Sequence, residues 1–414
     1  MFAQGFRTIR AALAAGVVSC RDVVDRSLSQ LDAHAWTNAV AWRDDDAVRA
    51  AAAALDARYA AEGPVGPLHG LPISVKDWIE ATPFPCAGGQ PAHRDRRPGR
   101  DATVVARLRA AGAIVVGKAS AGAHTELYGT VRHGVDPGLS PGGSSAGDAV
   151  LVAAGAVAFG LGSDSGGSLR YPAHCTGIAT IRPTYGRVPL TGHFPRVGPG
   201  SDGRTVIGPL ARTVADVRAV LDVIAGPDGR DPACPPVPVA SGSGVGAHRR
   251  VALDRRPLAG AGALDLAGDV AVERAAAALA AAGAEVVECD VLGVDAALDI
   301  TRRYWGRSSL SGREVDRFLA DWDRERVRAM GLLARFDAIL TPAAPEPARP
   351  LGQADDTDWT FTLAPSLWGW PAAVVRAGWA GSDPPLPVGV QLIAGPWRED
   401  LCLALAAVVE AGCR

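Results

Sequence analysis

The sequence predicts an α/β protein, because strand-like and helix-like segments alternate along the chain. A strand-like run covers 73–75, and a helix-like segment followed by an apolar strand covers 101–116. A strand, an Ala-rich helix and a second strand follow one another again over 250–289. With 414 residues, of which 48% are hydrophobic, the chain can bury a large core.

Local signals justify the elements in order. The segment 1–62 has a helical pattern and predicts an outer helical layer, in which Ser19 and Asp22 have the spacing of a capping box. The strand over 73–75 follows a Gly/Pro loop and delivers Lys76 at its carboxyl end, where ligand chemistry gathers in open α/β sheets. Asp101 is expected to cap the next helix, which stops at Gly112.

Two Gly-Gly-Ser turns, 142–144 and 166–168, flank an apolar segment that predicts a buried helix followed by a strand. Each turn presents one serine hydroxyl. Glycine pairs let backbone N–H groups approach a ligand closely, so the second turn could hold donors around a developing oxyanion. This pattern indicates acyl-transfer chemistry.

A serine nucleophile needs a base that removes its proton. Of the 42 lysine and arginine residues, only Lys76 and Lys118 are lysines. A chain that uses arginine almost everywhere keeps lysine where a permanently charged guanidinium would not serve, and a proton acceptor is such a place. Lys76 is therefore the best candidate for the base, and Lys118 is interpreted as a structural lysine.

At these residues the chain resembles the amidase signature family. The matching segments are GPLHGLPISVKD (66–77), DATVVARLRAAGAIVVGK (101–118), PGGSSAGDAVLVAAG (141–155), GSDSGGSLRYPA (162–173) and RPTYGRVPLTG (182–192), with weaker matches to 395. The resemblance implies a large mixed, mostly parallel central β-sheet flanked by α-helices. It also implies a Ser-cisSer-Lys triad and a reaction that needs no cofactor and no metal.

The resemblance assigns each role to a residue of this chain. Ser168 would be the acyl-accepting nucleophile, Ser144 the bridging serine after a cis peptide from Gly143, and Lys76 the base. Asp164 and Arg170 would support the turn, the first through backbone hydrogen bonds and the second by pairing with a carboxylate. The oxyanion is expected to be held by N–H groups around Ser165, Gly166, Gly167 and Ser168.

One domain is expected over 1–414. Within it, 64–226 would form the catalytic core with its Gly/Ser-rich motif, and 227–248 a Pro/Gly-rich loop. The remainder, 249–414, would be a second α/β portion that completes the sheet and the acyl pocket. Five aromatic and three arginine side chains are candidates for an aromatic pocket with a carboxylate anchor: Tyr304, Trp305, Trp359, Trp368, Trp370, Arg302, Arg303 and Arg376.

Other motifs that would place the chemistry elsewhere match this sequence less completely. Residues 143–147 fit the G-x-S-x-G elbow, which would make Ser145 the nucleophile, but DPGLSP precedes them where a strand is required. Residues 112–118 fit a phosphate-loop pattern, yet Ala119 replaces the magnesium-binding Ser/Thr. A Ser-His mechanism would need one of three histidines: His124, His133 and His174. The family triad, however, contains no histidine.

The composition limits the partners and the location. A net charge of −2 argues against nucleic acid or an acidic membrane, and the longest apolar run, 149–162, is too short to span a bilayer. The first ten residues lack the order of a secretion signal, so a cytoplasmic protein is expected. The seven scattered cysteines are expected to be reduced and without metal. A small-molecule amide is the expected partner, and a homodimer is compatible with these observations.

Three functions are compatible with the sequence. The leading one is an amidase that hydrolyses a small or medium acyl amide through a Ser168 acyl-enzyme, giving a carboxylic acid and ammonia or an amine. The second is an amidotransferase subunit that passes ammonia to another active site. The third is a non-catalytic scaffold of the same fold, which would have no need for a buried lysine and two placed serines.

Overall fold

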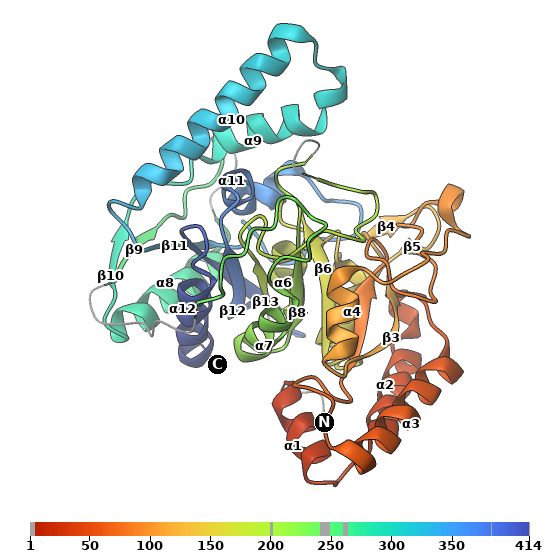
Figure 1. The fold of residues 1–414 in the computed structure, drawn as a ribbon. Coiled ribbons are helices and arrows are strands. Elements are labelled where there is room, and N and C mark those ends of the chain that lie inside the picture. Colours follow the sequence, from red (N-terminus) through yellow and green to blue (C-terminus); the bar gives the residue numbers. More distant parts are fainter. Residues whose placement is uncertain (1–4, 199–201, 241–248, 260–263, 382, 414) are drawn as a thin grey trace.

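The computed structural model describes residues 5–198, 202–240, 249–259, 264–381 and 383–413 (Figure 1). Its centre is a sheet of 11 strands in the order β1-β3-β2-β6-β8-β7-β12-β13-β11-β9-β10. Helices α4, α7, α8 and α12 pack against one another and the sheet, while α5 and α6 form a separate contacting group. The expected α/β class, with a large sheet flanked by helices, is confirmed.

Three helices lie together at one end of the molecule, opposite α9 and α10 (Figure 1). They are α1 (Phe6–Ala14), α2 (Cys20–Ala33) and α3 (Asp45–Glu62), and the sequence did not predict the short strand β1 (Val40–Trp42) between them. The expected capping box is confirmed: Ser19 Oγ accepts a hydrogen bond from the Asp22 N–H at 3.0 Å. The apolar faces of α2 and α3 are buried against β2 and β3, the strands next to the edge strand β1.

The first half of the sheet holds both serine turns. Its elements are β2 (Pro72–Lys76), α4 (Thr103–Ala110), β3 (Ile114–Ala119), β4 (His124–Thr125), β5 (Gly129–Thr130), α5 (Ala146–Ala153), β6 (Phe159–Asp164), α6 (Arg170–Thr176), β7 (Ala179–Arg182), β8 (Val206–Ala211) and α7 (Val214–Ile224). The expectation for Asp101 is wrong, because α4 begins after Ala102 without a side-chain cap. The Asp101 carboxylate instead accepts the N–H of Thr82 at 2.7 Å.

The second half of the chain adds strands β9 to β13 and helices α8 to α12. Its elements are β9 (Arg250–Leu253), α8 (Leu266–Ala281), β10 (Glu285–Glu288), α9 (Val294–Trp305), α10 (Gly312–Leu332), β11 (Ala338–Pro342), α11 (Thr360–Trp368), β12 (Ala372–Ala380), β13 (Leu386–Ala394) and α12 (Glu399–Gly412). Residues 227–240 contain neither helix nor strand, and the rest of the expected loop, 241–248, lies outside the described residues.

The balance of strand directions differs from the expectation of a mostly parallel sheet. Among the described strands, four neighbouring pairs of the large sheet are parallel and six are antiparallel. The cause is local: β8 lies antiparallel between β6 and β7, and β12 and β13 form a hairpin. Parallel pairing remains where β2 lies between β3 and β6, which is the part that carries Lys76.

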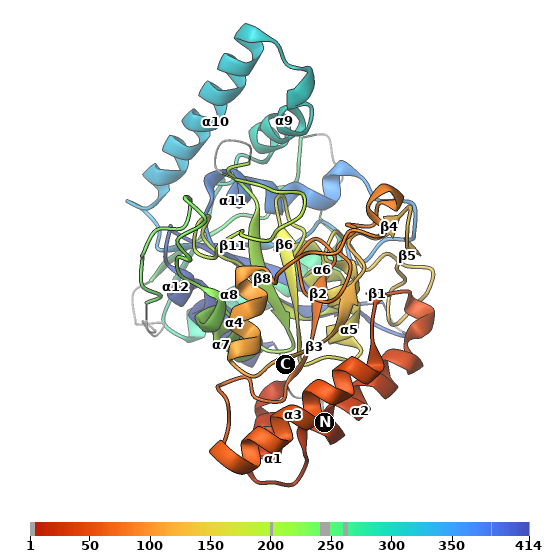
Figure 2. The ribbon, with the colours of Figure 1, turned by 45° about the vertical axis from the view of Figure 1, so that its right-hand side comes forward.

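Helices α9 and α10 project above the sheet, and η5 (Asp356–Trp359) and α11 lie beneath them (Figures 1 and 2). A second apolar cluster joins these helices, and Phe318, Trp322 and Phe361 are among its buried members. Throughout the described residues, every helix falls short of the length and apolarity needed to cross a bilayer.

Candidate active site

Lys76 lies at the end of β2 with its side chain fully buried. Its Nζ is 2.7 Å from Ser144 Oγ, 3.2 Å from Ser145 Oγ and 3.1 Å from Ser163 Oγ. The Trp78 ring covers it at 4.4 Å from Nζ to the ring centroid. A lysine surrounded by hydroxyl oxygens, without an ion pair among the described residues, is suited to exchange protons with one of them.

Burial lowers the pKa of Lys76 to about 7, because removing an ammonium from water disfavours its charged form. The negative charges of Asp148 and Asp164 act in the opposite direction and limit this fall. Asp148 is itself buried on α5, where desolvation raises its pKa to about 7, and its Oδ1 accepts the Ser74 hydroxyl at 2.6 Å. A large share of Lys76 is therefore neutral near pH 7.

Ser144 stands at the first turn, between β5 and α5. The peptide bond between Gly143 and Ser144 is cis, as the resemblance implies. Ser144 is half-buried, whereas the neighbouring Ser145 is completely buried, and the N–H of Ser163 lies 3.3 Å from its Oγ. Burial leaves Ser145 without access for a substrate, which argues against the elbow interpretation.

Ser168 stands at the second turn, between β6 and α6, and is half-buried. The two turns are in contact, since the Ser145 N–H donates to the Ser168 carbonyl at 3.1 Å. A Cβ added to Gly142 would lie 3.0 Å from the Pro172 backbone, so this glycine permits the close approach of the first turn to α6, which follows the second turn. In the described structure the Ser144 and Ser168 hydroxyls do not hydrogen-bond to each other.

Asp164 holds the shape of the second turn. Its Oδ1 accepts the Gly167 N–H at 2.8 Å, and its Oδ2 accepts the Leu169 N–H at 3.1 Å. Burial alone would raise the pKa of this carboxyl, but the positive charge and hydrogen bonds of Arg170, with Arg182 next in weight, hold it well below its usual range. Asp164 therefore stays ionised and acts as an acceptor for the turn.

Arg170 locks this turn to distant parts of the chain. Its Nε and Nη2 each lie 3.0 Å from a different oxygen of Asp164, which makes the pair bidentate. Its Nη1 donates to Gln391 Oε1 at 2.7 Å and to the Thr362 carbonyl at 2.9 Å. Residues from β13 and α11 thus fix the segment that carries Ser168.

The N–H groups of the second turn are not equivalent. That of Gly167 is engaged by Asp164, so it shapes the turn. Within the described part of the chain, those of Ser165, Gly166 and Ser168 have no hydrogen-bond partner. Their part in binding an oxyanion stays a prediction.

A cavity of about 270 Å³ opens beside Ser168. Helix α9 forms one wall and η5 with α11 the other; the lining residues are Gly166, Ser168, Leu298, Thr301, Arg302, Trp305, Asp356, Trp359 and Leu363. Of the candidates for an aromatic pocket, the structure brings Trp305, Trp359 and Arg302 to this cavity. Tyr304, Trp368 and Trp370 are buried in the second apolar cluster, and Arg303 and Arg376 do not line the cavity.

The remaining candidates lie apart from the serines. Lys118 is ion-paired with Asp77 at 3.2 Å, both fully buried, as expected of a structural lysine. His133 and His174 are buried, each 2.9 Å from a backbone carbonyl oxygen, and His124 is exposed. The described residues contain no cluster of three His, Cys, Asp or Glu side chains arranged to hold a metal.

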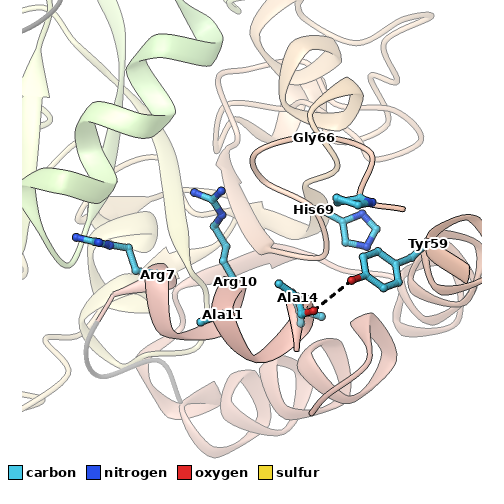
Figure 3. Close-up of a pocket in the computed structure, with 9 residues that line it drawn as sticks. Arg7, Arg10, Ala11, Ala14, Tyr59, Gly66 and His69 are labelled. Atoms are coloured by element: carbon cyan, nitrogen blue, oxygen red, sulfur yellow. Dashed lines mark hydrogen bonds between the residues drawn. The ribbon is translucent and has the colours of Figure 1, made fainter. Parts of the chain in front are cut away.

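A second cavity, of about 360 Å³, lies between α1 and the segment after α3 (Figure 3). Arg7, Arg10, Tyr59 and His69 line it, and Tyr59 donates a hydrogen bond to the Ala14 carbonyl at 3.4 Å. None of the predicted catalytic residues lines this cavity. It lies among the amino-terminal helices, at the opposite end of the molecule from α9 (Figure 1).

Sequence reasoning missed Ser163, Arg182 and Arg204. Ser163 lies one strand away from Lys76, and only the pairing of β2 with β6 brings it near. Arg182 Nη1 donates to the Asp164 carbonyl at 2.8 Å. Arg204 Nε donates to the Ser165 carbonyl at 3.0 Å, from a loop before β8 that carries no motif signal.

Comparisons with known proteins show the family to which the chain is related. The family model described as Amidase matches residues 22–317 and 317–403. Indoleacetamide hydrolase of Bradyrhizobium diazoefficiens is 32% identical, over 97% of this chain and 84% of its own length. The AtzE component of 1-carboxybiuret hydrolase from Pseudomonas sp. is also 32% identical, over 96% of each chain. A component of the glutamyl-tRNA(Gln) amidotransferase of Chloroflexus aurantiacus is 42% identical, over 55% of this chain and 48% of its own.

Solved structures show the same architecture. The peptide amidase of Stenotrophomonas maltophilia superposes with a TM-score of 0.84 at 25% identity, over 98% of this chain and 96% of its own. A structure described as an amidase superposes with a TM-score of 0.85 at 28% identity, over 99% of this chain and 100% of its own. The whole sheet and its helices are therefore shared with these proteins.

Proposed function

The chain belongs to the amidase signature family, and we propose that it hydrolyses the C–N bond of a small or medium acyl amide through an acyl-enzyme on Ser168. The observation that carries the proposal is the 2.7 Å contact between the buried Nζ of Lys76 and Ser144 Oγ, at a turn that touches the turn of Ser168. A structural lysine would be expected to pair with a carboxylate, as Lys118 does.

The proton path follows from the pKa of Lys76. A lysine with the ordinary pKa of about 10.4 is neutral at pH 7 in roughly one molecule in 2,500, which costs about 4.6 kcal/mol. At a pKa of about 7 this cost nearly vanishes. Neutral Lys76 takes the Ser144 proton, while Ser144 takes the Ser168 proton as the Ser168 oxygen attacks the amide carbonyl carbon.

The negative oxygen of the tetrahedral intermediate must then be stabilised, and its nitrogen must be protonated so that it can leave. The N–H groups of Gly166 and Ser168 would donate to its oxyanion, at a place already shaped by Asp164. The proton returns through Ser144 to the nitrogen, the C–N bond breaks, and ammonia or an amine leaves. Water attacks the acyl-enzyme by the same proton path, giving a carboxylic acid and free Ser168.

A fluorophosphonate probe tests the nucleophile directly. We expect one adduct per chain by intact mass, mapped by peptide sequencing to Ser168, because this serine lines the cavity, whereas Ser144 and Ser145 do not. Release of carboxylic acid and ammonia from simple amides would accompany it. An adduct on Ser145 would instead support the elbow interpretation, and folded protein without any adduct would contradict the proposal.

The rate should fall in acid as Lys76 becomes protonated. Since the base acts in its neutral form and its pKa is about 7, log kcat/KM is expected to rise with pH below about 7 and to level off above it. Asp148→Asn should move the midpoint to lower pH, because the negative charge of Asp148 raises the pKa of Lys76. A profile that is flat across this range would contradict the role of Lys76, and an unmoved midpoint in the variant would show that Asp148 is already neutral there.

A second candidate function is favoured by one observation, the 42% identity to the glutamyl-tRNA(Gln) amidotransferase component over 236 residues. In that case ammonia would pass to another active site and a partner protein would be needed. Glutamine hydrolysis that rises on addition of a partner would indicate this function. Steady hydrolysis of amides by the isolated chain would indicate the first.

A further inference from the structure

One buried arginine beside the cavity lacks the counter-charge that the others have. Four arginine side chains are fully buried in the described residues, and three of them contact a carboxylate. Arg204 is the exception, and it makes no ion pair within the described structure. The rings of Tyr304 and Trp305 cover its guanidinium, with Cζ 4.1 and 5.1 Å from the ring centroids. A ring does not neutralise a buried charge, so an anion supplied from outside the chain would stabilise it. The paired arginines are Arg170 and Arg182, which share Asp164, and Arg187, which contacts Glu399.

The hydrogen bonds of Arg204 leave one nitrogen free. Its Nε donates to the Ser165 carbonyl at 3.0 Å, and its Nη1 donates to Thr301 Oγ1 at 3.3 Å. Its Nη2 is buried and has no hydrogen-bond partner in the described structure. The nearby Asp202 accepts the backbone N–H groups of Arg204 and Thr205, at 2.8 and 3.0 Å, and so serves the loop.

The free nitrogen faces the cavity wall next to Ser168. A Cβ added to Gly166 would lie 3.2 Å from Arg204 Nη2, so the absence of a side chain there leaves an opening toward the guanidinium. Gly166, Thr301 and Ser168 all line the same cavity. A ligand oxygen in front of Gly166 would therefore be within hydrogen-bond distance of Nη2.

The other positive charge at this cavity is already satisfied. Arg302, at the rim, lies 2.8 Å from Asp356 through a solvent-exposed ion pair. Trp305 and Trp359 supply the apolar walls between the rim and Ser168. Arg204 itself does not line the cavity: it lies behind Gly166, and the described residues place no carboxylate within ion-pair distance of it.

We propose that Arg204 binds a carboxylate in the acyl part of the substrate, which makes that substrate the monoamide of a short dicarboxylic acid. Gly166 and Ser168 are two residues apart, a span of at most about 7 Å, so two or three carbons would separate the carboxylate from the amide carbonyl. The inference rests on the proposed function, since it concerns the substrate of the same site. The bond broken is the amide C–N bond, and the carboxylate is unchanged.

A matched pair of amides tests this specificity. Succinamate carries the carboxylate, and 4-methylpentanamide replaces it with an isopropyl group of similar shape. We expect wild-type kcat/KM to favour succinamate by about 10- to 100-fold, the usual worth of a buried charge-assisted hydrogen bond. Arg204→Gln should abolish this preference, while Arg303→Gln, which removes an arginine of α9 that does not line the cavity, should keep it.

The outcomes separate the inference from the function on which it rests. Equal losses for both amides in Arg204→Gln would show that Arg204 only holds the Ser165 carbonyl, and a wild-type preference for the neutral amide would overturn the proposal. Calorimetry can measure the binding of both amides to the Ser168→Ala protein, in which Arg204 is intact. This measurement depends neither on turnover nor on the folding of an Arg204 variant. Succinamate binding there, with the neutral amide binding at least about 10-fold more weakly, would support the inference even if fluorophosphonate labelling failed.

Discussion

Replacing Ser168 by alanine is expected to lower kcat by about 10⁴-fold or more, the scale seen when the nucleophile of a serine hydrolase is removed. The change deletes one half-buried oxygen, so the fold should be retained. Asp164 would still accept the N–H groups of Gly167 and Leu169. Amide turnover and unfolding temperature, measured on the same preparation, check both parts of this expectation.

Ser145→Ala is the matched control for that loss. It removes the same atom from a serine of the first turn, whose Oγ lies 3.2 Å from Lys76 Nζ. Since Ser145 is fully buried, its loss should reduce stability by about 1–3 kcal/mol and leave fluorophosphonate labelling of Ser168 intact. If Ser145→Ala were inactive while Ser168→Ala kept its turnover, the assignment of the nucleophile would be wrong.

Lys76→Arg is expected to lower kcat by about 10³-fold or more, although it keeps the positive charge. A guanidinium has a pKa above about 12 and cannot become the neutral base that the relay needs. It is also larger, in a site where the lysine Nζ already contacts three hydroxyl oxygens. Single-turnover acylation, followed with an ester substrate, measures the step that should be lost.

Lys118→Arg makes the same exchange at the other lysine of the chain. Its partner is the Asp77 carboxylate, which an arginine can also bind, so folded protein should retain turnover. Circular dichroism gives the folded fraction to which both variants are normalised. Turnover by folded Lys76→Arg at the level of Lys118→Arg would remove Lys76 from the proton path.

Much of the scaffold could be predicted from local pattern. Short apolar runs bounded by loops predict the strand that ends at Lys76 and the strand at Arg250–Leu253. The capping box at Ser19 was recognised from spacing alone. The proportion of antiparallel pairs was not predictable in this way, because β6, β7 and β8 carry similar apolar patterns whatever the direction of their neighbours.

Some residues of the candidate site could likewise be predicted from the sequence, and others could not. Lys76, Ser144 and Ser168 could be proposed because composition, turn chemistry and family resemblance coincide at them. Arg204 could not, since an arginine among 42 basic residues carries no mark of burial, and its contacts with Ser165 and Thr301 span 39 and 97 residues. Its lack of a partner is a property of three-dimensional packing.

The hydrogen bonds that hold the Ser168 turn involve residues that the ribosome adds late in synthesis. Arg170 contacts Gln391 across 221 residues of sequence, and it contacts Thr362 across 192. On the ribosome, the chain therefore emerges with both serines and Lys76 long before the residues that immobilise the turn. We therefore expect the nascent chain to be inert as a hydrolase until nearly all of it has been synthesised. Truncation before β13 should yield protein that contains Lys76, Ser144 and Ser168 but lacks the Gln391 contact that holds the Ser168 turn.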